Sequence, residues 1–81
     1  MYITNNLDKP IFVNDQELLP NVSKEFFEGI FGTNKIQSDC GSATITTEYS
    51  TRHIETSGDI KIIELASNDK YGMKLISVES A

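Results

Sequence analysis

DIKIIELASNDKYGMKLISVES, residues 59–80, contains two runs of β-branched and other apolar residues around a polar cluster. The runs IKIIEL (60–65) and MKLISV (73–78) flank SNDK (67–70), a group of turn-forming residues. Two such runs joined by a short polar turn are typical of an antiparallel hairpin. This stretch therefore predicts a mainly β protein.

The alternation of apolar residues changes phase within this predicted hairpin. Ile60 and Ile62 would share one face of a strand, whereas Ile63 would point to the other face. With the tip of the hairpin at 68–69, Ile62 is expected opposite Leu75. A bulge or bend explains such a change of phase, and so does a strand covered on both faces, by the core and by a neighbouring subunit.

The N-terminal third predicts a second hairpin and a segment of ambiguous structure. YIT (2–4) and IFV (11–13) are separated by residues rich in turn formers, which favours two paired strands. The apolar residues of 23–31 recur at a helical spacing, so a short helical turn is expected there, although aromatic residues also favour a strand. In either conformation these apolar side chains are expected in the core; they are Phe26, Phe27, Ile30 and Phe31.

The run ATITTEYSTRHIET, residues 43–56, predicts one long strand with two polar faces. Ala43, Ile45 and the later odd-numbered residues would share one face, and the even-numbered residues the other. Neither face is strongly apolar beyond Ile45, which is typical of an edge strand or of one that another chain covers. Together these segments predict five or six short strands in a small antiparallel barrel or sandwich, with residues 1–81 as a single domain.

Composition limits the compartment and the partners. The single cysteine, Cys40, allows no intramolecular disulfide and suits a reducing compartment. The first twenty residues carry no secretory leader, and no apolar run approaches the roughly 20 residues of a membrane span. A cytoplasmic protein is therefore expected. The net charge of −5 and the absence of a Lys/Arg cluster argue against direct nucleic-acid binding.

Reactive side chains are too sparse in the sequence to predict an enzyme. His53 is the only histidine, and on a regular strand it would point away from Ser50. One cysteine and one histidine cannot form a closed zinc site, and the five glycines are isolated, so neither a metal nor a phosphate-binding cofactor is expected. A domain of 81 residues also leaves little interior for a small-molecule pocket.

A small acidic β protein with uncovered strands predicts a protein–protein interaction module without catalytic activity. The first hypothesis is a self-associating structural component, such as a virion or phage accessory protein, because polar-faced strands are readily completed by a second copy. Its predicted interface residues are Thr44, Thr46, Glu48, Tyr49, Ser50, Arg52 and Tyr71. The alternative is a small acidic inhibitor or immunity-type protein that covers a basic surface of a nucleic-acid-handling partner, through Asp15, Glu17, Glu25 and Glu28.

Overall fold

The computed structural model describes residues 1–27, 30–49, 51–68 and 73–81, with the backbone alone for 66–68 and 73–74. These residues form nine strands and no helix: β1 (Tyr2–Asn5), β2 (Ile11–Val13), β3 (Gln16–Leu18), β4 (Ser23–Glu25), β5 (Phe31–Ser38), β6 (Gly41–Glu48), β7 (Thr51–Gly58), β8 (Ile60–Asn68) and β9 (Met73–Ser80). The predicted mainly β class and its sandwich form are confirmed, with nine strands rather than five or six. Within the described ranges, no helix has the length and apolarity of a membrane span.

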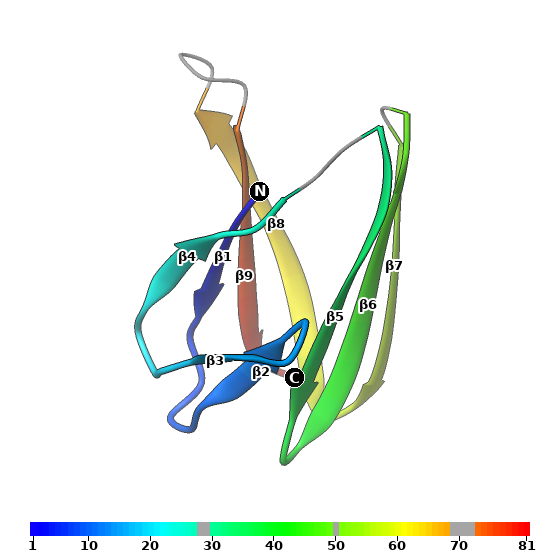
Figure 1. Cartoon of the computed structure of the whole chain (residues 1–81). Coiled ribbons are helices and arrows are strands. Elements are labelled where there is room, and N and C mark those ends of the chain that lie inside the picture. Colours follow the sequence, from blue (N-terminus) through cyan, green and yellow to red (C-terminus); the bar gives the residue numbers. More distant parts are fainter. Residues whose placement is uncertain (28–29, 50, 69–72) are drawn as a thin grey trace.

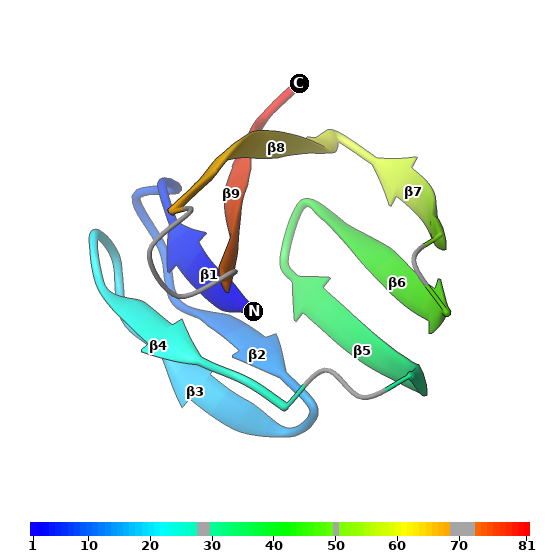
Figure 2. The ribbon, with the colours of Figure 1, turned by 90° about the horizontal axis from the view of Figure 1, so that it is seen from above.

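The strands form two sheets that face each other (Figures 1 and 2). One sheet has the order β4-β1-β9-β8, and the other has the order β3-β2-β5-β6-β7. β1 pairs antiparallel with β4 and parallel with β9, which brings distant parts of the chain together. The predicted N-terminal hairpin is wrong, because β1 and β2 lie in different sheets. Residues 6–10 instead carry the chain from one sheet to the other.

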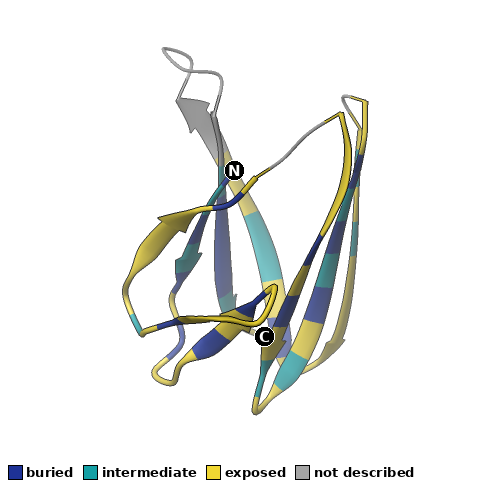
Figure 3. Ribbon diagram, in the orientation of Figure 1, coloured by how far each residue is buried: buried dark blue, intermediate teal, exposed yellow. Residues whose placement is uncertain are grey.

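The core lies between the two sheets (Figure 3). Ile3, Ile76 and Val78 of the four-stranded sheet are fully buried, and Ile36 and Ile45 bury their side chains from the five-stranded sheet. In β1, β5 and β6 the residues between the buried ones are exposed or half-buried, as the two-residue period of a strand requires, whereas in β9 the intervening Ser77 is buried too. Burial of β-branched side chains at alternate positions is therefore what holds the sandwich together.

The predicted C-terminal hairpin is confirmed as β8 and β9, but with a different register. Ile62 pairs with Val78 rather than with Leu75, and the register shifts only beyond Leu65. The strand therefore passes through Ile62 and Ile63 without a bulge, and the change of phase reflects two apolar faces. Ile62 packs against the core, while Ile63 is half-buried on the opposite face.

Two other sequence predictions are wrong. The expected helical turn over 23–31 is not formed, because Ser23–Glu25 is a strand that pairs with β1 and Phe31 begins β5; residues 28–29 lie outside the described part. The expected long strand over 43–56 is a hairpin in which Glu48 pairs with Thr51. Tyr49 lies in the turn with a φ of 56°. This backbone conformation is uncommon for a tyrosine, so the residue type gave no signal of the turn.

Candidate interaction surface

The outer face of the five-stranded sheet carries a polar surface built from every second residue of β5, β6 and β7. Asn34 and Ile36 of β5 are buried, as are Ala43 and Ile45 of β6, so the residues between them point away from the core. Directly paired residues share a face, which aligns the outward side chains in rows across the sheet. Two of these rows are Thr33–Thr46–His53 and Lys35–Thr44–Glu55.

The structure brings together only part of the predicted interface set. Thr44, Thr46 and Glu48 lie on this outer face, as the alternation along β6 predicts. Arg52 does not join them, because the turn after Glu48 reverses the phase and pairs Arg52 with the buried Thr47 on the inner face. Ser50 and Tyr71, also predicted, lie outside the described residues.

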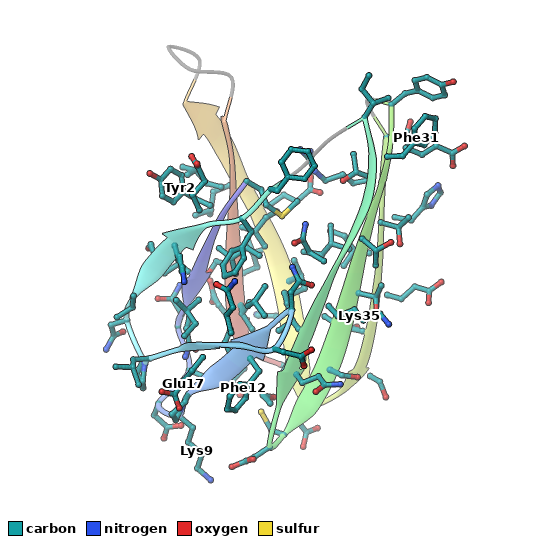
Figure 4. All side chains as sticks on the ribbon, in the orientation of Figure 1. Tyr2, Lys9, Phe12, Glu17, Phe31 and Lys35 are labelled. Carbon is teal, nitrogen blue, oxygen red and sulfur yellow. The ribbon has the colours of Figure 1, made fainter. Side chains whose placement is uncertain are left out.

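An exposed apolar cluster lies at the end of this sheet where β5 begins and β6 ends. It comprises Ile30, Phe31 and Tyr49, whose exposed fractions are 64%, 58% and 70%, and it is called the apolar tip below. The Phe31 and Tyr49 rings meet edge to face with centroids 4.7 Å apart, and the Tyr49 N–H donates to the Ile30 carbonyl oxygen at 2.7 Å. Figure 4 shows Phe31 at this end of β5, far from Phe12 on β2. Backbone pairing and ring contact thus fix the apolar tip in place.

Sequence reasoning missed the apolar tip, because it placed its phenylalanine and isoleucine in the core. Of the four apolar residues expected there, only Phe26 is buried, while Phe27 is 86% exposed. A signal was available in the strand that follows. Phe31 has the same parity as Thr33 and Lys35, so strand alternation would have placed it on the solvent side.

One strand edge of this sheet is long and regular. β7 ends the strand order, and among the described strands it pairs with β6 alone (Figure 2). Eight consecutive residue pairs, from Gly41–Gly58 to Glu48–Thr51, join the two strands without a register shift. In an antiparallel pair, alternate N–H and C=O groups of the outer strand point away from its neighbour, and they can accept another strand.

The predicted acidic surface is spread over three elements. Asp15 lies in the β2–β3 turn, Glu17 on β3 and Glu25 on β4, and all three are exposed. Glu28 lies outside the described residues. Lys24 lies among these acids, with its Nζ donating to Gln16 Oε1 at 2.8 Å, so a cation interrupts the acidic surface.

Among the described residues, His53 and Cys40 are the remaining reactive groups, and they lie apart from the apolar tip. His53 is exposed on the outer face opposite Thr46. Cys40 is exposed, with Sγ 3.4 Å from Ser38 Oγ, beside an open depression of about 560 Å³ between the β1–β2 and β5–β6 connections. In the part of the chain that is described, no three His, Cys, Asp or Glu side chains lie close enough to hold a metal ion.

Comparison of the chain with known protein families, with curated proteins and with solved structures found no match. The apolar tip, the outer face and the β7 edge are therefore the features that bear on function.

Proposed function

We propose that this chain is a protein–protein interaction module without catalytic activity, which self-associates as a structural or assembly component. The apolar tip is the single observation that carries the proposal. Contiguous exposed apolar side chains are unfavourable in water, and aromatic residues in particular act as anchors when a partner covers them. The edge-to-face contact of Phe31 and Tyr49 holds both rings in one arrangement, which lowers the entropy lost on binding.

A second copy is the partner that the rest of the surface supports. The outer face next to the tip is rich in threonine, and β7 offers an edge of eight regularly paired residues. An edge of this kind presents N–H and C=O groups that can pair with the same strand of a second subunit. A cytoplasmic assembly or a virion, with the chain as an accessory protein, is the setting that we propose for it.

The first test is the solution mass of the protein by light scattering after size exclusion, over a range of concentrations and at low and high salt. A defined oligomer at both salts is expected, because apolar burial is not screened by ions. A double variant, Phe31→Ser with Tyr49→Ser, is expected to weaken association at least about tenfold, as two anchors of about 1 kcal/mol each would. Phe12→Ser is the matched control, since Phe12 is 44% exposed on the same sheet but far from the tip.

Two outcomes would contradict this proposal. A monomer of 9.0 kDa at every concentration would exclude self-association as the function. Equal weakening by Phe12→Ser and by the tip variant would exclude the tip as the anchor. A monomer that binds a basic protein with steep salt dependence would instead favour the acidic inhibitor hypothesis, with Asp15, Glu17 and Glu25 as the surface to neutralise.

A further inference from the structure

β7 is the sheet edge best suited to accept another strand. Among the described strands, β3 and β4 end their sheets with only three residues each. β8 is longer, but its register breaks between Leu65 and Asn68, and such irregularity hinders regular pairing. Of the four edge strands in the described part of the chain, β7 is the one with eight unbroken pairs to its neighbour.

The sequence of β7 is complementary to itself when read in the opposite direction. In a continuous antiparallel sheet, two residues directly opposite each other point to the same face. Neighbours along a strand point to opposite faces, so a residue cannot lie opposite the copy of its neighbour. A pairing about a two-fold axis must therefore place one residue opposite its own copy. With Ile54 at that position, His53 lies opposite the partner's Glu55, and Glu55 lies opposite the partner's His53. Moving the centre by one residue would place either His53 or Glu55 opposite its own copy, with like groups together.

We propose that two copies of the chain pair through β7, antiparallel and about a two-fold axis at Ile54. This inference rests on the proposed function and specifies the partner, the edge and the register. The exposed His53 and Glu55 side chains then form two symmetric cross-strand pairs on the outer face. Ile54, which packs against the core, meets its own copy on the inner face.

The register has a consequence for the apolar tip. Overlap of residues 51–57 with the same residues of the partner spans about 20 Å at 3.3 Å per residue. This overlap brings the start of β7, just after Tyr49, next to the partner's Gly58, at which the partner's β7 ends. The two five-stranded sheets become one continuous sheet. Tyr49, in the turn that precedes β7, is the residue of each tip that lies next to the junction.

The decisive experiment exchanges charges across the proposed two-fold axis, with the dimer dissociation constant measured by sedimentation equilibrium at pH 7. His53→Glu places like charges opposite each other twice and is expected to raise this constant about tenfold. Adding Glu55→His to the same chain restores the pairing in reverse order and should bring the constant back to within about threefold. Thr33→Glu is the matched control, because it adds a negative charge in the same row on β5, away from the edge.

Hydrogen exchange provides a second readout that does not depend on the variants. β7 amide protection is expected to rise with protein concentration, while that of β8 stays constant. The proposed register is overturned if the wild-type protein dimerises without added amide protection in β7 and His53→Glu leaves the dimer dissociation constant unchanged. Self-association itself would then stand. A wild-type monomer at all concentrations would overturn both proposals.

Discussion

At the scale of single residues, Asn5 is a buried polar residue whose side chain makes three hydrogen bonds. Its side chain is fully buried, and its Nδ2 donates to the carbonyl oxygens of Lys9 at 2.8 Å and of Leu18 at 3.0 Å. Its Oδ1 accepts from the Leu7 N–H at 2.9 Å, which shapes the connection after β1. Buried amides bonded at both ends in this way specify one arrangement of the loops around them.

Asn5→Asp is expected to destabilise the fold strongly, because it turns a donor to two carbonyl groups into an acceptor. Leaving these groups unsatisfied beside a charge should lower the free energy of unfolding by about 3–5 kcal/mol at pH 7. Burial raises the folded-state pKa of the introduced carboxyl above its unfolded value. The loss is therefore complete above the folded pKa and shrinks as the pH falls below it.

Urea denaturation at pH 8 and pH 5 measures both effects. Asn21→Asp is the control, since Asn21 is exposed and its φ of 64° suits either residue. A change in the free energy of unfolding below about 1 kcal/mol for Asn5→Asp would contradict the importance given to these three hydrogen bonds.

At the scale of elements, the corner between β7 and β8 moves the chain from one sheet to the other. Gly58 has a φ of +86°, and a Cβ placed on it would lie 2.5 Å from the Cys40 carbonyl oxygen and 2.7 Å from the Gly41 Cα. The Asp59 N–H donates to that same carbonyl at 2.7 Å. The close approach of the two backbone segments, 40–41 and 58–59, leaves no room for a side chain.

Gly58→Ala is expected to lower the free energy of unfolding by about 2–4 kcal/mol, from the left-handed conformation and the backbone contact together. Gly32→Ala is the matched control in β5, because a Cβ there would meet no atom within 4 Å. That change should leave stability unaltered or raise it by up to about 1 kcal/mol. Chemical denaturation of the two variants compares them directly, and equal losses would argue against a special role for the corner.

Elements are also where the limits of sequence reasoning are clearest. The alternation in 59–80 predicted the β8–β9 hairpin because neighbouring strands and a polar turn are local features. The turn at Tyr49 was missed because its residue lacks the glycine, asparagine or proline that usually signals one. That single omission reversed the predicted face of every later residue, including Arg52 and His53. The pairing of β1 with β9 was unpredictable for another reason, since it joins segments about seventy residues apart.

At the scale of the whole molecule, the β7 pairing predicts that assembly responds to pH. A histidine gains a proton as the pH falls from 8 to 5, and the partner's Glu55 carboxylate would favour that charged form. Dimerisation then takes up protons, so the association constant should rise about threefold to tenfold between pH 8 and pH 6. The groups that face or adjoin His53 are Thr46, Thr44 and Glu48 of β6, Thr33 of β5, and Thr51 and Glu55 of β7.

Sedimentation at pH 8 and pH 6 tests this response, with His53→Gln as the control that retains a polar side chain without the charge. The variant should lose most of the pH dependence, because His53 is the only histidine of the chain. Equal pH dependence in the variant and in the wild type would assign the response to other groups and count against the His53–Glu55 pairing.

The parallel pairing of β1 with β9 bears on how the protein is made. On a ribosome, β1 emerges early, but its long-range partner is synthesised about seventy residues later, and closing so long a loop is slow. The consecutive strands β5, β6 and β7 pair with sequence neighbours and can form before that. For that interval Ile36 and Ile45 have no opposite sheet to cover them. The nascent chain is thus most prone to aggregation just before β9 emerges, which is when a chaperone would be most useful to it.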